Sequence, residues 1–319
     1  MNKPIIGVFR EKRDIEEFVF KSAVYKQAYH ELYDTIARKG AQVAILMGQG
    51  SYLGEGRFAQ HWVQVKTDDG FKFEKREVIK VDAVYDKDGF IGDGKVLVLN
   101  SIQMRDICHD KHKSYELLQE FHPKSVVVHD AKQLDDALAA MPGSKIAVKG
   151  LQGNSGTAVF VGDKSDAHAE EDILRYPVQV QEFIETAGGV PGIVEGRHDF
   201  RVVLMNGEPI IATYRTPPEG GLKSNLGYGG VSKLVPHAKI PTELREICTQ
   251  IDKKLAPIST YRFYSADFGL TAYGWRLFEI NSMPGVLAKE RGPEAAYYQE
   301  KLTDFLVRVA TAGQEGLLQ

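Results

Sequence analysis

The chain opens with a strand, a helix and a second strand, and this order restricts the fold more than any other feature. Residues 5–9 form a short apolar run, which is typical of a buried parallel strand. From Asp14, a helix-capping residue type, to Arg38, apolar side chains recur at three- and four-residue steps, which predicts an amphipathic helix. Gly40 suits the left-handed position that ends a helix, and residues 42–46 form another apolar run. The sequence therefore predicts that a small parallel sheet opens the protein.

The rest of the chain continues this mixed α/β order without an internal repeat. Residues 62–66 and 71–79 flank the turn residues 67–70, which predicts a β-hairpin. Further strands are predicted at residues 81–85, 96–99, 125–128, 146–149, 157–161, 178–184, 200–205, 209–214, 265–270 and 275–280. Helices are predicted from Asp110 to about residue 121, around residues 132–140, after Pro241 and at the C-terminal end.

Composition excludes several classes of protein. The chain carries 40 Lys and Arg residues against 43 Asp and Glu, and this acidic excess gives no basic face for nucleic acid or for a membrane surface. Cys108 and Cys248 are too few for a disulfide scaffold and are wrongly spaced for a zinc site. The N-terminus lacks the apolar run of a signal peptide, and no stretch approaches the ~18 apolar residues of a membrane span. We therefore expect a cytoplasmic protein with neither a nucleic-acid nor a membrane partner.

Three oxygen-bearing side chains lie in two apolar segments near the C-terminus. If the turn between the segments is centred on Tyr273, Asp267 faces Glu279 and both side chains project from one face of the hairpin. Asn281 follows Glu279 by two residues and shares that face. Such hard oxygen ligands suit Mg²⁺ bridged to phosphates, with Mn²⁺ as the alternative cation. A solvated sheet face is the other reading, but the apolar neighbours and the Pro-Gly stop after the ligands favour the metal.

Basic residues stand at several places where they could meet phosphate. Lys149 ends a predicted strand and precedes the glycine-rich segment 150–156, which could offer backbone N–H groups. The segment lacks the Walker spacing and leads into a strand, so a P-loop or Rossmann reading fails, and an ordinary hairpin loop fits equally well. Lys111 at a helix start works against the helix dipole unless a phosphate lies nearby, and a solvated basic turn is the alternative. Arg215 ends an apolar strand, where a guanidinium could brace a transferring phosphoryl group.

In chain order these pieces resemble the ATP-grasp superfamily, in its branch of RimK-like glutamate ligases and glutathione synthetases. The resemblance covers roughly residues 105–290 and is most specific from Gln181-Glu182-Phe183-Ile184-Glu185 to Pro284-Gly285. It implies an α/β (α+β) ATP-grasp fold with an N-terminal Rossmann-like pre-ATP-grasp domain at residues 1–104. A small ATP-grasp subdomain at 105–182 and a C-terminal subdomain with the metal site at 183–319 would then hold ATP between them.

The resemblance also implies the roles of individual residues. Lys111 and Lys149 would hold the α- and β-phosphates under a mobile loop of Gly153, Asn154, Ser155 and Gly156. The hinge residues Glu182, Phe183 and Ile184 would meet the adenine edge, and Asp199 with Arg201 would form the family's Asp-x-Arg position near the nucleotide. The stretch between Gly189 and Asp199 is longer than is usual in the family, so the ribose ligand stays open among Glu185, Glu195 and Asp199. Arg215, Lys223 and Asn225 would act on the transferred phosphate and the acceptor, and Asp267, Glu279 and Asn281 would be the metal ligands.

The implied activity is an ATP-dependent ligase that forms a C–N bond. A substrate carboxylate would attack the γ-phosphate of ATP to give an acyl phosphate and ADP, and an amine would then displace phosphate to form an amide. At least one substrate would be an amino acid or a peptide. Two alternatives stay open, namely a phosphotransferase with a stable phosphorylated product and a nucleotide-binding protein without turnover. The identities of the substrates and the formation of a homo-oligomer also stay open.

Overall fold

The computed structural model describes residues 2–11, 15, 22–68, 70–152, 159–169, 175–224 and 229–318. Contacts divide the chain into two compact units. The first contains Met1–Ile102, Ile258–Phe263 and Met283–Gln319, and the second contains Gln103–Pro257 and Tyr264–Ser282. The division into domains at 1–104, 105–182 and 183–319 stays a prediction, and the contacts group the C-terminal residues with the N-terminal unit. Within the described residues, no helix has the length and apolar character that a membrane span requires.

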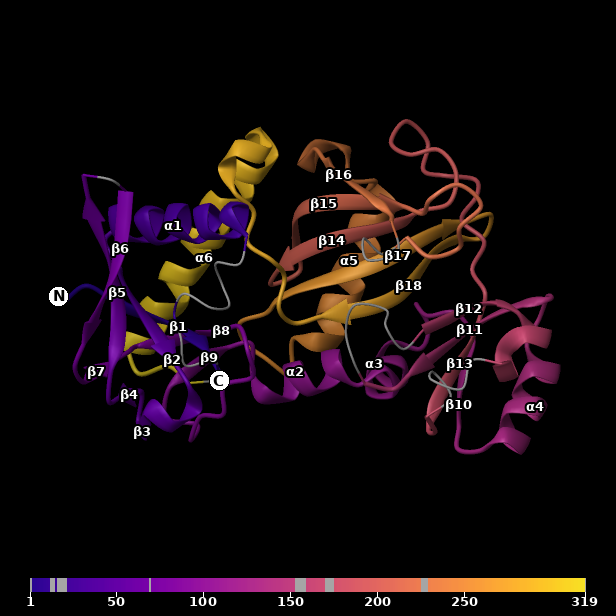
Figure 1. Cartoon of the computed structure of the whole chain (residues 1–319), viewed down its shortest axis with the longest axis horizontal. Helices are drawn as coiled ribbons and strands as arrows, with labels where there is room; N and C mark the ends of the chain where they lie inside the picture. The colour runs from indigo at the N-terminus through magenta and orange to yellow at the C-terminus, as the bar shows by residue number, and fades with distance from the viewer. Residues whose placement is uncertain are drawn as a thin grey trace. The chain divides into compact units, whose positions relative to one another are not determined.

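The first unit is built on a six-stranded sheet, which the figures show in indigo and violet (Figure 1). Its order is β6-β5-β2-β1-β8-β9, and β2, β1, β8 and β9 run parallel. The bounds are β1 (Ile5–Arg10), β2 (Gln42–Met47), β5 (His61–Thr67), β6 (Gly70–Arg76), β8 (Ala83–Asp86) and β9 (Leu97–Leu99). Short strands β3 (Tyr52–Gly54), β4 (Arg57–Phe58) and β7 (Ile79–Lys80) form a separate sheet.

The predicted strand–helix–strand opening is confirmed. Helix α1 (Ala23–Arg38) connects β1 to β2, which pair in parallel, and Gly40 has the left-handed φ of +87° expected after a helix. The predicted cap Asp14 lies outside the described residues, and Ser22 precedes the first described turn of α1. Residues of β1, β2 and β8 such as Val8, Leu46 and Val84 are fully buried, because both faces of this parallel sheet are covered.

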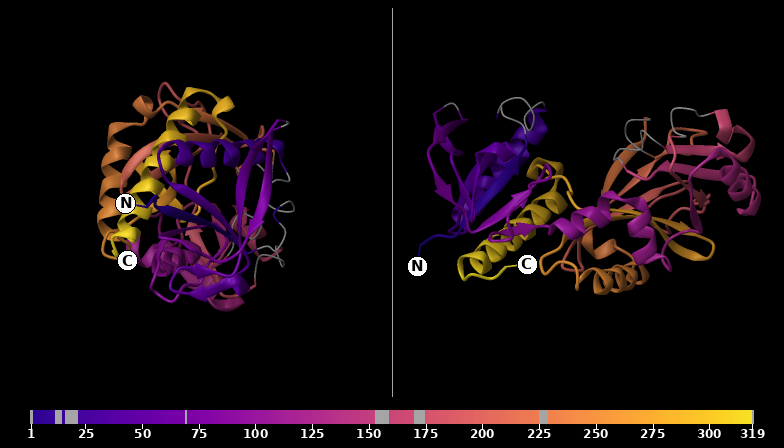
Figure 2. Two further views of the ribbon diagram at one scale, coloured as in Figure 1. Left: turned by 90° about the vertical axis from the view of Figure 1, so that its left-hand side faces the viewer. Right: turned by 90° about the horizontal axis from the view of Figure 1, so that it is seen from below.

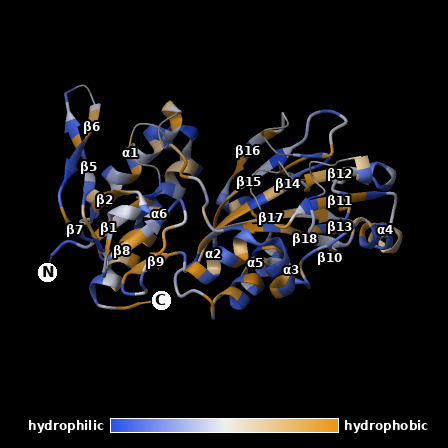
Figure 3. Cartoon of the chain, turned by 60° about the horizontal axis from the view of Figure 1, so that its bottom comes forward, coloured by the Kyte–Doolittle hydropathy of each residue, from blue (hydrophilic) through white to orange (hydrophobic). Residues whose placement is uncertain are grey.

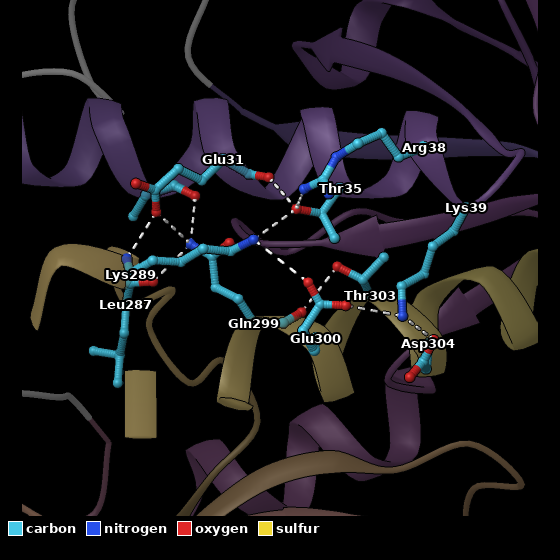
Figure 4. A network of polar contacts seen from close by, with 11 residues as sticks. Glu31, Thr35, Arg38, Lys39, Leu287, Lys289, Gln299, Glu300, Thr303 and Asp304 are labelled. Carbon is cyan, nitrogen blue, oxygen red and sulfur yellow. Dashed lines mark hydrogen bonds and ion pairs between the residues drawn. The ribbon is translucent and has the colours of Figure 1, made fainter. Parts of the chain in front are cut away.

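The C-terminal helix α6 (Pro293–Gln314) packs beside α1 in this unit through a buried polar network (Figure 4). The Gln299 side chain is fully buried, and its Nε2 donates to the carbonyl oxygens of Ala28 at 3.1 Å and Leu287 at 2.7 Å and to Oε2 of Glu31 at 3.1 Å. Lys289 donates its backbone N–H to the same Glu31 oxygen at 2.8 Å. One amide therefore supplies the hydrogen-bond donor for two backbone carbonyls inside this interface.

The second unit contains two sheets, drawn in magenta to pink and in pink to orange in Figures 1 and 2. The four-stranded sheet has the order β10-β13-β11-β12, with all neighbours antiparallel. Its strands are β10 (Ser125–Val128), β11 (Lys145–Gly150), β12 (Val159–Asp163) and β13 (Val178–Glu182), and helix α4 (Ala131–Ala140) packs against them. Helices α2 (Ile102–His109) and α3 (Lys111–Leu118) precede this sheet, and Asp110 caps α3 as predicted by accepting from the N–H groups of His112 and Lys113.

The five-stranded sheet of this unit has the order β16-β15-β14-β17-β18. Its strands are β14 (Asp199–Met205), β15 (Glu208–Thr216), β16 (Val231–Val235), β17 (Phe263–Thr271) and β18 (Gly274–Asn281). Helix α5 (Thr242–Leu255) lies along this sheet and shows both hydrophobic and hydrophilic residues, as expected of a helix with one buried face (Figure 3).

The β17–β18 hairpin places Asp267 opposite Glu279, as predicted, but the position of the turn and the strand register differ from the prediction. Thr271 pairs with Gly274, so the turn is centred between Ala272 and Tyr273, and the prediction that it is centred on Tyr273 is wrong. A β-bulge then inserts one extra residue in β18, between the partners of Phe268 and Asp267. The bulge shifts the later residues of β18 by one position and returns Glu279 to the face of Asp267.

Other elements differ from the prediction at their ends. Strand β13 ends at Glu182, earlier than the predicted residue 184, and the predicted strand at 157–161 begins in a stretch outside the described residues. The sequence reading missed α2, β16 and the short strands β3, β4 and β7, which are too brief or too polar to show a periodicity.

We predict that Gln299→Met lowers the free energy of unfolding by about 2–4 kcal/mol, because two buried carbonyl oxygens lose their hydrogen-bond donor. Urea denaturation followed by circular dichroism measures this change. The control is Lys39→Ala, which removes ion pairs to Glu300 and Asp304 on the exposed part of the same helix interface. It should cost less than about 1 kcal/mol. Equal effects of the two variants would contradict a special role for the buried amide.

Candidate functional site

A cavity of about 210 Å³ in the second unit gathers most of the predicted site residues. Both sheets of this unit contribute to its lining. The predicted residues that line it are Lys111, Lys149, Glu182, Phe183, Ile184, Asp199, Arg215, Lys223, Asp267 and Glu279. Its remaining walls include the apolar side chains of Ala147, Val159, Val161, Leu222 and Phe278. The cavity thus has a charged part and an apolar part.

Arg201 and Asn281 do not line this cavity, and their predicted roles stay predictions. Arg201 donates to both oxygens of Asp267, and Asn281 donates from Nδ2 to Oε1 of Glu279 at 3.2 Å. Asn281 lines a second, smaller cavity that also involves Lys111 and Glu279. Gly153, Asn154, Ser155, Gly156 and Asn225 lie outside the described residues.

Asp267 is the centre of the charged part. Its side chain is 1% exposed, and Arg201 grips both of its oxygens, with Nε to Oδ1 and Nη2 to Oδ2 each at 2.6 Å. Arg215 adds a bond from Nη2 to Oδ2 at 2.8 Å and also donates to Asp199. These contacts join strands β14, β15 and β17, because each strand supplies one or two of the four charged side chains.

The shared arginines affect the two carboxyl groups differently. Burial would raise the pKa of Asp267, but Arg201 and Arg215 outweigh burial and lower this pKa to about 2. Burial raises the pKa of Asp199 to about 7, and the neighbouring Asp267 carboxylate adds to the increase while Arg215 opposes it. Asp267 is therefore the charged partner of the arginines across the neutral pH range.

The acidic side chains form a donor set that fits Mg²⁺. Glu279 lies opposite Asp267 in the hairpin, and Asn281 is hydrogen-bonded to Glu279. Carboxylate and amide oxygens are the hard ligands that Mg²⁺ prefers. Arg201 Nη2 lies 3.8 Å from Oε1 of Glu279, so the arginine also borders this donor set. Within the described ranges, no group of three or more His, Cys, Asp or Glu side chains is arranged to hold a metal, and the set at the hairpin consists of two carboxylates and one amide.

Two lysines face the acidic groups from the other side of the cavity. The pKa of Lys149 is lowered to about 8, mainly by burial; Glu279 opposes this decrease and Lys111 contributes to it. Burial also lowers the pKa of Lys111, against the attraction of Glu279. The Lys149 ammonium lies 6.0 Å from the ring centroid of Phe278, which is within the range of a cation–π contact. A phosphate group in the cavity would restore the charged state that burial disfavours.

Gln181 and Ser125 lie at the site, and neither of them was assigned a role from the sequence. Lys149 Nζ donates to Oε1 of Gln181 at 2.6 Å, and Nε2 of Gln181 donates to Oγ of Ser125 at 2.9 Å. The signal was present in the strand sequence Val178-Gln179-Val180-Gln181. The two valines point into the core beneath α4, so the glutamines must point to the opposite face, which borders the cavities.

The long segment before Asp199 also contributes an unexpected residue. Arg197 lines the cavity and pairs with Glu185 through Nε at 3.0 Å and Nη2 at 2.8 Å. His198 fixes the end of the segment, because its Nε2 accepts from the N–H of Leu270 at 3.2 Å and its backbone bonds to Thr186. Of the three ribose candidates, Asp199 lines the cavity, Glu185 is held by Arg197, and Glu195 borders a separate surface hollow.

Comparison with known proteins shows what the chain is similar to. The family model for the ATP-grasp domain of prokaryotic glutathione synthetase matches residues 113–285. A probable alpha-L-glutamate ligase of Thioalkalivibrio sulfidiphilus is 30% identical over 188 residues, which is 56% of this chain and 56% of that relative. A protein of the same description from Aeromonas salmonicida is 26% identical over 299 residues, covering 86% of this chain and 90% of the relative. The crystal structure of VanG D-Ala:D-Ser ligase from Enterococcus faecalis shares the fold, with a TM-score of 0.65, 15% identity, and coverage of 97% of this chain and 100% of that one.

We predict that Asp267→Ala lowers the free energy of unfolding by about 3–5 kcal/mol, because Arg201 and Arg215 stay buried after losing their shared carboxylate. The matched control is Glu279→Ala, which removes a more exposed carboxylate 3.8 Å from Arg201 and should cost less than about 1 kcal/mol. Urea denaturation of both variants measures the difference. A loss as large for Glu279→Ala as for Asp267→Ala would show that Asp267 does not dominate the cluster.

Proposed function

Because the chain belongs to the ATP-grasp family of the prokaryotic glutathione synthetases, we propose that it is an ATP-dependent ligase that joins a carboxylate to an amine. Family membership and the shared fold confirm the resemblance predicted from the sequence. The observation that carries the proposal is the cavity itself, in which two lysines face Asp267 and Glu279 and an apolar wall lies beside them. This layout fits a nucleotide with its phosphates among the charges and its base against the apolar side chains.

The reaction requires positioned charges rather than a side-chain nucleophile. The substrate carboxylate oxygen would attack the γ-phosphorus of ATP, and the bond from that phosphorus to the β-phosphate oxygen would break, releasing ADP. The amine nitrogen would then attack the acyl-phosphate carbonyl carbon, lose a proton, and expel inorganic phosphate. Lys111 and Lys149 would bind the phosphates of ATP, and Arg215 would stabilise the transferred phosphoryl group.

Asp267, Glu279 and Asn281 would hold Mg²⁺, with Mn²⁺ as a substitute. The bound cation would neutralise phosphate charge. Arg215 lines the cavity and already binds Asp267, so Arg215 and the metal ligands would act on the same phosphates, whereas Arg201 would hold Asp267 in place.

The substrates would be an amino acid or a peptide. The alpha-L-glutamate ligases among the relatives make glutamate the first amino acid to test. The chain spans 56% of the length of the Thioalkalivibrio relative, so its own pair of substrates is a separate question. Cys108 and Cys248 are both buried free thiols, which suits the reducing cytoplasm where ATP is supplied.

We predict amine-dependent release of ADP and phosphate when ATP and Mg²⁺ are screened with pairs of amino acids and short peptides. Hydroxylamine should trap the activated carboxylate as a hydroxamate. Release of AMP and pyrophosphate would refute the acyl-phosphate route, and a phosphorylated product that persists with every amine would favour a phosphotransferase.

Glu279→Ala should fold normally yet lose at least about a hundredfold in the rate of ADP release, the usual scale for a key electrostatic stabiliser.

We also predict that the affinity for ADP falls as the pH rises from 7 to 9. The pKa of Lys149 is lowered to about 8, so its charge is present below this pH and is lost above it, whereas an ordinary lysine keeps its charge to pH 10. Isothermal titration calorimetry at pH 7, 8 and 9 measures the change. Lys149→Arg provides the control, because arginine stays charged and should flatten the profile. An equally steep profile for this variant would assign the pH effect to another group.

A further inference from the structure

We propose that Gln181 is a positioning residue that aims the Lys149 ammonium at the nucleotide phosphates, and that Ser125 fixes the orientation of Gln181. This proposal rests on the proposed ATP site and adds two residues to it. Lys149 is a long, flexible side chain whose ammonium alone has no preferred direction. Gln181 therefore holds the Lys149 side chain in one orientation before a phosphate binds, so that binding costs less conformational entropy.

A directional chain of hydrogen bonds carries the argument. The hydroxyl group of Ser125 donates to the carbonyl oxygen of Pro123 at 3.0 Å, so its oxygen is left to accept a bond. The NH₂ group of Gln181 supplies that bond at 2.9 Å. The amide oxygen of Gln181 must consequently point the other way, where it accepts from Lys149 Nζ at 2.6 Å. Because lysine can only donate, a flipped amide would lose both contacts.

Strand register keeps these three side chains together. Gln181 lies in β13, between β10 and β11, directly opposite Ser125 on one side and Ala147 on the other. Lys149 follows Ala147 by two residues, so its side chain shares the face of Gln181 and lies diagonally across from it. Gln181 is only 2% exposed, and both it and Lys149 line the cavity. The chain of bonds thus begins inside the sheet and ends at the cavity wall.

The Gln181 amide carries no charge, and this matters for phosphate binding as much as its position does. A carboxylate at position 181 would hold Lys149 more tightly but would cancel its charge and compete with the phosphates. An amide oxygen orients the ammonium and leaves its full positive charge to act on the ligand. Phe278 lies 6.0 Å from the ammonium and likewise contributes no formal charge.

The test is equilibrium binding of ADP and of adenosine to the full chain, in buffer with Mg²⁺, by isothermal titration calorimetry. Gln181→Met keeps the length of the side chain and removes the acceptor. We expect ADP to bind about tenfold more weakly and adenosine to bind unchanged, since only ADP has phosphates that Lys149 can reach. In a Lys149→Met background the same substitution should have almost no further effect on ADP, because the two residues act through one contact.

Further variants keep the proposal falsifiable. Gln181→Glu preserves shape and hydrogen bonding, and it should weaken ADP binding through its charge while leaving thermal stability intact. Gln133→Met makes the same change in helix α4, where the side chain lines neither cavity, and should alter ADP affinity less than twofold. Equal ADP affinities of the unmodified protein and both Gln181 variants would overturn this proposal alone. An equal loss of affinity for adenosine, or an equal loss of ADP affinity in Gln133→Met, would also overturn it. Failure of the unmodified protein to bind ADP would overturn the proposed function and this proposal with it.

Discussion

The buried carboxylate of Asp267 is the interaction on which the second unit depends. A charge this far from water is tolerable only with close partners, and Arg201 and Arg215 supply three charge-assisted bonds from neighbouring strands. The pairing joins β14, β15 and β17, and it holds the Arg215 guanidinium at the cavity. The same contacts explain why Asp267 stays ionised while the adjacent Asp199, which shares Arg215, is easier to protonate.

The two sheets of this unit differ in how their buried charged side chains are paired. The five-stranded sheet balances each buried charge internally, with Asp199 and Asp267 against Arg201 and Arg215. The four-stranded sheet instead holds Lys149 with the neutral amide of Gln181, so burial lowers the pKa of this lysine. A balanced cluster contributes stability and position, whereas a cation held by a neutral group keeps its attraction for an anionic ligand. The cavity lies where these two arrangements face each other.

The sequence predicted the elements better than the local irregularities that shape the site. Asp267 and Glu279 were correctly placed opposite each other, although the turn is centred elsewhere and a bulge in β18 makes up the difference. Period-two patterns cannot reveal a bulge, because one extra residue changes register without changing composition. The bonds from Arg201 to Asp267 could not be read from the sequence, and the predicted place of Arg201 near the nucleotide stays a prediction. Arg197 lines the cavity from a segment without periodicity. Gln181 could have been found, since polar residues alternating with core valines on a central strand require an explanation.

Asp267 and Glu279 therefore contribute differently to the stability of the fold and to the proposed metal site. Asp267 takes part in both, because the arginines that need it for pairing border the same donor set that suits a metal. Glu279 lies on the other strand of the hairpin, opposite Asp267, and its side chain is more exposed. Fewer buried charges are therefore paired with Glu279 than with Asp267. A loss of activity in an Asp267 variant would combine a weakened strand network with a missing ligand. The proposed metal-binding role can be tested apart from folding at Glu279, where the bulge brings a carboxylate to the site without building it into the core.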